Sequence, residues 1–93
     1  MYAITFDLNI AQLENHYPNA SYQNAYGDIA KFLKPRGFAR QQGSVYFGGD
    51  EVDAVHTVLT VAKMSAELPW LQQCTTDIRM LRIEDDNDLM QAL

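Results

Sequence analysis

Large apolar residues alternate with smaller or polar ones over the first positions of the chain, MYAITFDL. This period of two is typical of a β-strand with one buried face. The apolar face comprises Tyr2, Ile4, Phe6 and Leu8. Asp7 falls on the other face, with Ala3 and Thr5. The pattern therefore predicts a first strand that places one carboxylate outside the core.

Further along the chain, apolar residues recur at steps of three and four between residues 22 and 33, which predicts an amphipathic helix. Pro35 and Gly37 follow it and are typical of a helix end. Two short strands are expected at 38–41 and 44–47, joined by a tight connection at Gly43.

A second helix is expected after the turn formed by Gly48, Gly49 and Asp50. Its predicted buried stripe consists of Val52, Val55, Leu59 and Ala62, with Ala66 as a further candidate. Pro69 ends this segment, and Trp70 and Leu71 are expected to close the bottom of the core. A fourth strand over residues 76–84 then leads into a short acidic tail that can form a helix.

The resulting order β-α-β-β-α-β predicts an α+β protein with the ferredoxin-like fold, a four-stranded antiparallel sheet with two helices on one face. Residues 1–93 are expected to form a single domain, because a second core would be too small to be stable. The other face of the sheet has no helix to cover it. We expect that face to carry Ser44 and Tyr46 and to suit a homodimer formed through sheet faces or edges.

The position of Ser44 relative to Asp7 bears on any shared site. If the third strand runs parallel to the first, Ser44 lies near Tyr2 and roughly 15 Å from Asp7, at about 3.3 Å per residue. Ser44 would then join Asp7 only across a dimer interface. Asp77, which begins the last strand, is expected beside Asp7 within one chain, because the first and last strands run antiparallel.

The composition is that of an ordinary folded protein, with 47% hydrophobic and 20% charged residues. No apolar run approaches the roughly 20 residues that span a bilayer, and the chain does not start like a signal peptide. A cytoplasmic protein without a membrane association is therefore expected. Cys74 is the only cysteine, so no internal disulfide can form, and its surroundings lack metal-ligand spacing.

The net charge of −5 does not indicate a nucleic-acid-binding protein, but four of the seven cationic residues lie within ten positions. They are Lys31, Lys34, Arg36 and Arg40. Such a patch can engage phosphates. It can equally be a solvated helix end, where cations interact favourably with the helix dipole.

Four residues stand out as candidates for chemistry. Asp7 is either a hydrogen-bonded strand-end carboxylate or a general base or metal ligand near a dimer axis. For Ser44 taken alone, a solvated hydroxyl is the favoured interpretation. Arg79 and Arg82 fall on opposite faces of the last strand, so at most one of them can face a bound phosphate. The pattern does not decide which, because both faces of that strand contain apolar residues.

Several stretches resemble the virulence-associated protein D family in their order and spacing. They are MYAITFDL, AYGDI, GF, QGSVYF, LPW and DIRMLRIED, which together cover essentially the whole chain. The family is related to small CRISPR-associated adaptation proteins of ferredoxin-like fold. The resemblance implies a homodimeric endoribonuclease that cleaves messenger RNA and often acts as the toxin of a bacterial toxin–antitoxin pair.

Carried over residue by residue, the resemblance implies that Asp7, Ser44 and Asp77 are catalytic. Tyr46 and Arg79 sit in matching motifs and are candidate RNA-binding residues, as is Arg40 from the basic cluster. The chain departs from the family at two positions. Thr76 stands where members often have a basic residue, and Leu81 where they often have an aromatic one, which concerns phosphate binding and base stacking.

Two functions from different classes follow. The first is an endoribonuclease with Asp7 as general base, acting on single-stranded RNA and controlled by a cognate antitoxin protein. Asp7 carboxylates could also hold a divalent ion such as Mg²⁺, and the sequence leaves that open. The second is a dimeric nucleic-acid-binding or regulatory scaffold with little or no catalytic activity.

Overall fold

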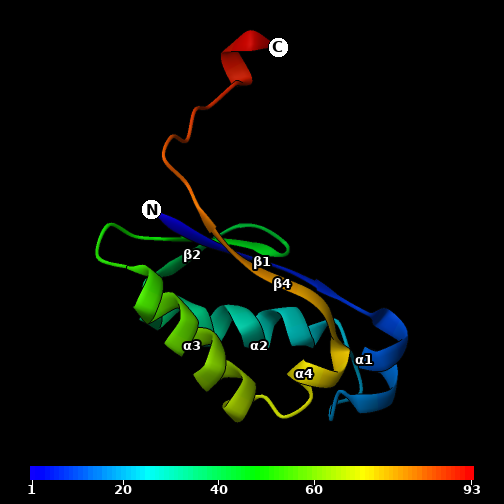
Figure 1. Cartoon of the computed structure of the whole chain (residues 1–93). Coiled ribbons are helices and arrows are strands. Elements are labelled where there is room, and N and C mark those ends of the chain that lie inside the picture. The colour runs from blue at the N-terminus through cyan, green and yellow to red at the C-terminus, as the bar shows by residue number, and fades with distance from the viewer.

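The computed structural model describes residues 1–93 as a four-stranded antiparallel sheet with helices on one side (Figure 1). The strands are β1 (Tyr2–Leu8), β2 (Phe38–Gln42), β3 (Val45–Gly48) and β4 (Thr75–Arg82), in the order β2-β3-β1-β4. Helices α2 (Asn24–Leu33) and α3 (Ala54–Glu67) lie side by side beneath the sheet. The predicted ferredoxin-like fold is confirmed.

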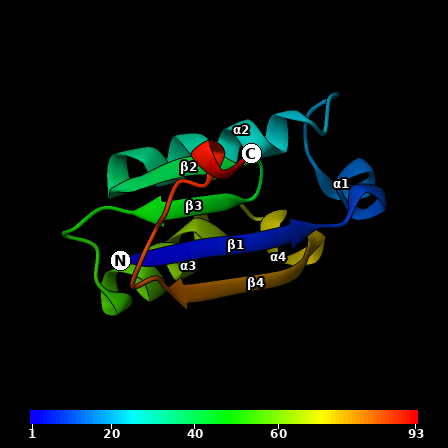
Figure 2. The same ribbon diagram turned by 90° about the horizontal axis from the view of Figure 1, so that it is seen from above.

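Two short helices were not expected from the sequence, and both lie near the end of the sheet where β1 ends (Figure 2). Helix α1 (Ile10–His16) begins after Asn9, whose side chain accepts a hydrogen bond of 2.9 Å from the backbone N–H of Gln12. Helix α4 (Leu71–Cys74) leads directly into β4. Trp70 is buried with Leu71, so the predicted closure of the core is confirmed.

The core lies between the sheet and the helices. Ile4 and Phe6 of β1 point into it and meet Ile29 and Leu33 of α2, and all four are at most 4% exposed. Burying a side chain of this size contributes about 1.5–3 kcal/mol, so the alternating face of β1 is a main determinant of the fold. Two 3₁₀ turns complete the elements, η1 (Lys34–Arg36) and η2 (Met90–Ala92).

Strand β3 runs antiparallel to β1, which corrects the expectation of parallel strands. Ala3 pairs with Phe47 and Thr5 with Val45. The physical reason is the hairpin: β1 and β2 run in the same direction, and the turn between β2 and β3 reverses the chain. Ser44 consequently lies at the same end of the sheet as Asp7, and its carbonyl accepts a 3.1 Å hydrogen bond from the N–H of Phe6.

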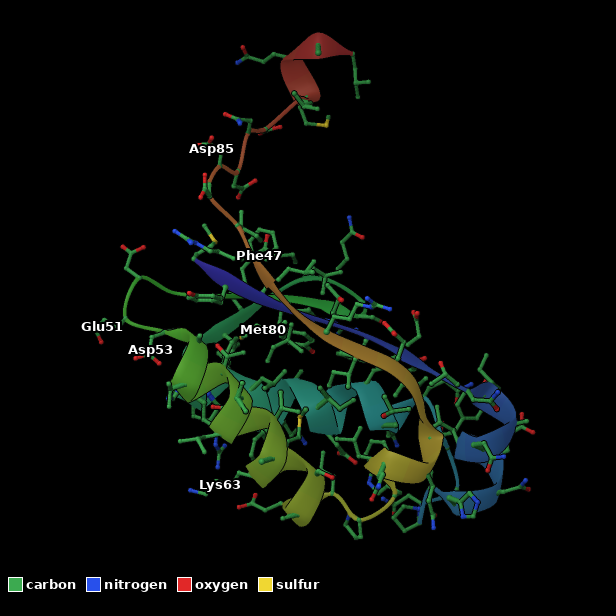
Figure 3. All side chains as sticks on the ribbon, in the orientation of Figure 1. Phe47, Glu51, Asp53, Lys63, Met80 and Asp85 are labelled. Carbon is green, nitrogen blue, oxygen red and sulfur yellow. The ribbon has the colours of Figure 1, made fainter.

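Tyr46 faces the helices, which corrects its expected position on the uncovered face. It pairs with Ile4, is 1% exposed, and stacks with Phe6 at a centroid distance of 6.1 Å. Because strand neighbours alternate, Val45 and Phe47 are on the uncovered face. Figure 3 shows Phe47 on the side of the sheet away from the helices.

Helix α3 presents a different face to the core from the one predicted. Val55 and Leu59 are 67% and 63% exposed, whereas Thr57 and Met64 are fully buried. Thr57 tolerates burial because its hydroxyl donates a 2.8 Å hydrogen bond to the carbonyl of Asp53. The predicted stripe of Val52, Val55, Leu59 and Ala62 is therefore wrong for all of its members except Val52.

The pairing of β4 with β1 settles which face of β4 is inward. Ile78 pairs with Phe6 and Met80 with Ile4, so both lie on the helix side, although they remain 37% and 42% exposed at this edge of the sheet. Arg79 pairs with Thr5 on the uncovered face. Of the two arginines considered from the sequence, Arg79 is thus on the same face as Asp7.

The last residues project from the domain. The backbone N–H of Ile83 donates to the carbonyl of Met1, and the amino group of Met1 donates to the carbonyl of Ile83, at 2.8 and 2.9 Å. Beyond this pair, residues 84–93 rise away from the uncovered face of the sheet (Figure 1). They end in the short turn η2, so the expected helical character of the tail is limited to Met90–Ala92. No helix in the protein has the length and apolar character needed to cross a membrane.

Candidate active site

Two carboxylates meet on the uncovered face of the sheet. Asp7 of β1 and Asp77 of β4 are direct partners in the antiparallel register, as expected from the sequence. Side chains of directly opposed residues lie about 4.5–5.5 Å apart at their Cβ atoms. Asp7 is exposed and its carboxylate has no hydrogen bond within the chain, while the Asp77 side chain is 40% exposed. The pair is therefore open to a ligand arriving on this face.

A β-bulge fixes the position of this pair. The register shifts after Asp7, because Leu8 pairs with Thr75 and leaves Thr76 as the extra residue of β4. The hydroxyl of Thr76 donates a 3.2 Å hydrogen bond to the carbonyl of Asp7. Bulges are common beside active sites because they redirect side chains. The Thr76 side chain thus holds the backbone of Asp7 in place.

Arg79 neutralises one of the two carboxylates. Its Nε donates to both oxygens of Asp77, at 3.1 and 3.0 Å. The hydrogen bond to Asp77 and the Asp77 charge raise the pKa of Arg79, so its guanidinium is a permanent cation. No bond within the chain engages its terminal nitrogens, and the side chain is 68% exposed. These nitrogens remain available to an anion.

Ser44 lies beside this cluster in the same chain. Phe6, the residue before Asp7, binds the Ser44 carbonyl through its backbone N–H. The half-buried Ser44 makes no side-chain hydrogen bond within the chain. The structure therefore brings Ser44 to the same end of the sheet as Asp7, Asp77 and Arg79, without a second subunit. Ser44 lies opposite Phe6 and two residues before Tyr46, so strand alternation favours the helix side for its side chain, which corrects its expected position on the uncovered face.

The site contains no histidine and no group of three metal-ligating side chains. Nowhere in the chain do three His, Cys, Asp or Glu residues gather in a metal-binding arrangement. His56 is in α3, and its Nε2 lies 2.8 Å from the carbonyl oxygen of Arg36. The side chains that the cluster itself offers are two carboxylates and a guanidinium.

Proteins that match this chain over almost its whole length identify its family. Endoribonuclease VapD 2 of Riemerella anatipestifer is 47% identical over 93 residues, 100% of this chain and 99% of the relative. Endoribonuclease VapD homolog of Helicobacter pylori is 46% identical over 93 residues, 100% of this chain and 96% of the relative. The chain belongs to the VapD endoribonuclease family.

A third relative, Endoribonuclease VapD of Dichelobacter nodosus, is 41% identical over 88 residues, which is 95% of this chain and 91% of the relative. No family model matches the chain. The family resemblance inferred from the sequence is confirmed by these relatives.

Two candidate RNA-binding residues of this VapD family member lie outside the carboxylate cluster. Tyr46 is in the core, on the helix side of the sheet. Arg40 pairs with Tyr46 in the β2–β3 register and its Nη2 donates a 3.3 Å hydrogen bond to the carbonyl of Gly43. The structure therefore separates them from Asp7 by the thickness of the sheet, while keeping Arg40 close to the hairpin that contains Ser44.

The link between Asp77 and Arg79 was not predicted. Residues two apart on a strand share a face, so the sequence Asp-Ile-Arg already placed a carboxylate beside a guanidinium. The bulge at Thr76 has no comparable signal in the sequence, because it depends on the pairing between β1 and β4.

Proposed function

We propose that this chain is an endoribonuclease whose active site is the cluster of Asp7, Asp77, Arg79 and Ser44. The observation that carries the assignment is the direct pairing of Asp7 with Asp77, of which only Asp77 is neutralised by Arg79. This leaves Asp7 as a free carboxylate next to a cation with unused donors. A base beside an anion-binding group is what cleavage of a phosphodiester requires.

Asp7 acts as the general base in this mechanism. It accepts the proton of a ribose 2′-hydroxyl, or of a water molecule, as that oxygen attacks the neighbouring phosphorus. General base assistance contributes about 100- to 10,000-fold to a rate. The absence of a histidine acid from the cluster leaves protonation of the departing oxygen to water, which is consistent with a modest overall rate.

Arg79 binds the phosphate. The terminal nitrogens of Arg79 make no hydrogen bond to Asp77, and they stabilise negative charge on the phosphate oxygens as the attack proceeds. A catalytic role for Ser44 is implied by the family resemblance, and from the turn before β3 its hydroxyl would reach the same phosphate only around the end of the sheet. Asp77 orients Arg79 and has no need to exchange a proton.

Asp7 and Asp77 could also supply part of the ligand set of a divalent cation. Mg²⁺ is usually bound by one or two carboxylates, with water and substrate phosphate completing its six ligands. Asp7 is free for such a role, and a bound ion would supply further positive charge at the phosphate. The proposed proton transfer to Asp7 and the binding of the phosphate use only side chains of the protein.

The uncovered face is also suited to a homodimer. Around Ala3, which is 1% exposed, the face carries apolar side chains from the neighbouring strands: Val45, Phe47 and Leu81. Two such faces can pack against each other through these residues while the Asp7 end of the sheet stays open. The proposed dimer consequently contains two separate sites, each formed by one chain.

The proposed substrate is single-stranded messenger RNA in the bacterial cytoplasm, and the proposed biological role is that of a toxin held in check by a cognate antitoxin protein. The support for this role is membership of the VapD family, which the sequence resemblance connects with toxin–antitoxin pairs. An exposed, shallow site that uses few groups is suited to unstructured RNA, whose backbone can lie across the sheet.

The deciding experiment incubates 5′-labelled single-stranded RNA with wild-type, Asp7→Asn and Arg79→Met proteins, each with Mg²⁺ and with EDTA. We expect internal cleavage by the wild type and a loss of about 100-fold or more for both variants. Asp50→Asn serves as the matched control, because Asp50 is an exposed carboxylate in the turn after β3, at the opposite end of that strand from Ser44.

Two further results define the mechanism. An RNA with a 2′-deoxyribose at the cleaved position should resist cleavage if the ribose hydroxyl is the nucleophile, and should still be cut if water is. Wild-type protein that binds the unmodified, all-ribose RNA without cutting it, with Mg²⁺ or with EDTA, would exclude the enzyme and favour the scaffold alternative.

A further inference from the structure

A second concave site lies on the opposite side of the sheet from the carboxylates. It is a cavity of about 440 Å³ between the end of α2 and the edge strand β2. Its wall includes Lys34 and Ala30 from the α2 side, Phe38 and Arg40 from β2, and Tyr46 from β3. The aromatic rings and aliphatic stems line the cavity, and two cationic groups stand at it.

Tyr46 supplies a polar group that has no partner. Its hydroxyl is buried and forms no hydrogen bond, the only buried side-chain polar atom in the chain for which this is so. Leaving such a group unpaired destabilises the fold, and native proteins usually avoid it. Burial raises the pKa of Tyr46, and the nearby Arg40 charge opposes that change. The hydroxyl is therefore a neutral donor in the neighbourhood of the Arg40 guanidinium.

The two cations at this cavity are also unpaired. The ion pairs of the chain involve Arg79 and Arg82, so neither Lys34 nor Arg40 has a carboxylate partner. Arg40 makes one long hydrogen bond, to the carbonyl of Gly43, and Lys34 makes none with its side chain. No acidic residue contributes to the cavity wall. Two cations and a hydroxyl donor without an internal acceptor together match the chemistry of a phosphate group.

The cavity is connected to the carboxylate cluster by the β2–β3 hairpin. Arg40 binds the carbonyl of Gly43, and the next residue, Ser44, binds the backbone of Phe6 beside Asp7. Arg79 and Arg40 are on opposite outer strands and opposite faces of the sheet, so an RNA strand reaches both only if it crosses the sheet and turns around the β2 edge.

We propose that Lys34, Arg40 and the Tyr46 hydroxyl form a phosphate-binding subsite, separate from the carboxylate cluster. The phosphate group is either part of an RNA strand, in which case the subsite rests on the proposed function and extends it, or a free phosphate ion. Because the hydroxyl has no exposed surface, binding requires a side chain at the cavity to move. Arg40 can do so by exchanging its bond to Gly43 for the phosphate.

The test uses three variants in the Asp7→Asn background, so that RNA stays intact. These are Lys34→Met, Arg40→Met and Tyr46→Phe, and binding of fluorescent RNA is measured by anisotropy. We expect each to weaken binding about tenfold, the value of one hydrogen bond to a charged group. Lys31→Met is the matched control: Lys31 lies in the last turn of α2, three residues before Lys34, but does not line the cavity, so its effect should be smaller.

The Tyr46→Phe variant distinguishes a binding role of the Tyr46 hydroxyl from a purely structural one, because the two roles predict different combinations of stability and binding. Removal of an unpaired buried hydroxyl should raise the melting temperature of the free protein by about 4–8 °C, because a domain of this size gains that much per kcal/mol. The same substitution should weaken RNA binding or abolish stabilisation by inorganic phosphate. Weaker RNA binding identifies RNA as the source of the phosphate, and loss of only the phosphate-induced stabilisation identifies the free ion.

The subsite is rejected if the three variants bind RNA as tightly as the Asp7→Asn parent and respond to phosphate in the same way. It is also rejected if Lys31→Met is as damaging as Lys34→Met, since the effect would then be one of general charge. Cleavage by the otherwise wild-type protein is measured in parallel. If the protein cleaves RNA but fails these tests, only the proposed subsite is rejected. If the protein passes these tests but does not cleave RNA, the proposed activity is rejected.

Discussion

Asp7 and Asp77 are direct partners on adjacent antiparallel strands, so two like charges face each other on an exposed sheet. Like charges in this position are destabilising by a few tenths of a kcal/mol to about 1 kcal/mol. Such a pair persists where function requires it. The arrangement gives Asp7 opposite effects on stability and on activity.

The first prediction is that Asp7→Asn stabilises the protein while removing its activity. Loss of the Asp7 charge should raise the free energy of unfolding by a few tenths of a kcal/mol, because Arg79 already compensates part of the Asp77 charge. Urea unfolding at pH 7 measures it, and the difference should shrink in high salt, which screens exposed charges. A destabilised Asp7→Asn protein would show that the carboxylate is structural.

The second prediction concerns which chain completes the site. Ser44 and Asp7 are joined through the Phe6 backbone of one chain, so a mixed dimer of Asp7→Ala and Ser44→Ala subunits contains no intact site. Its RNA cleavage should stay at the level of the two parents. The mixed species is verified by native mass spectrometry. Recovery of about a quarter of wild-type activity in the mixture would instead mean that the site is shared between chains.

The third prediction compares two leucines in the helices that cover the sheet. Leu59→Ala in α3 should change the free energy of unfolding by less than about 0.5 kcal/mol, because the side chain is 63% exposed. Leu33→Ala at the end of α2 should cost about 2–5 kcal/mol, because Leu33 is fully buried. Denaturant titration of both variants gives the comparison, and equal losses would show that Leu59 is covered in solution by a partner chain.

The fourth prediction is a loss of stability in alkali that depends on Tyr17. Its hydroxyl donates a 2.6 Å hydrogen bond to Asp28, and burial, followed by this bond, raises the pKa of Tyr17 above 10.0. Above pH 10 the unfolded chain releases this proton while the folded chain retains it, so folding loses stability as pH rises. Tyr17→Phe should be less stable at pH 7 and lose less between pH 9 and 11. Thermal melts across this range measure both effects, and identical slopes for the two proteins would contradict the assignment.

The sequence predicted the order and type of the main strands and helices because their periodic patterns are long and their ends are marked by Pro and Gly. The prediction of the buried face failed where the two faces of an element have similar polarity. Val45, Tyr46 and Phe47 are all strand-forming and apolar in part, so alternation alone does not say which face is buried. In α3, Thr57 is buried because its hydroxyl is satisfied by the helix backbone, which no apolar pattern reveals.

The candidate site was predictable where it depended on residues close in sequence or on strand pairing that the fold imposes. The pairing of Asp7 with Asp77 belongs to this class. The relation of Ser44 to Asp7 was missed because it depends on the direction of β3, and the hairpin after β2 determines that direction.

The position of Asp7 and Asp77 on an open sheet face, with Arg79 two-thirds exposed beside them, bears on the kinds of RNA that can be cut. A site without walls makes no demand for a free 5′ or 3′ end, because the strand can be laid across it at any internal point. Covalently closed circular RNA should therefore be opened as readily as a linear RNA of the same sequence, and trimming from the ends should be absent.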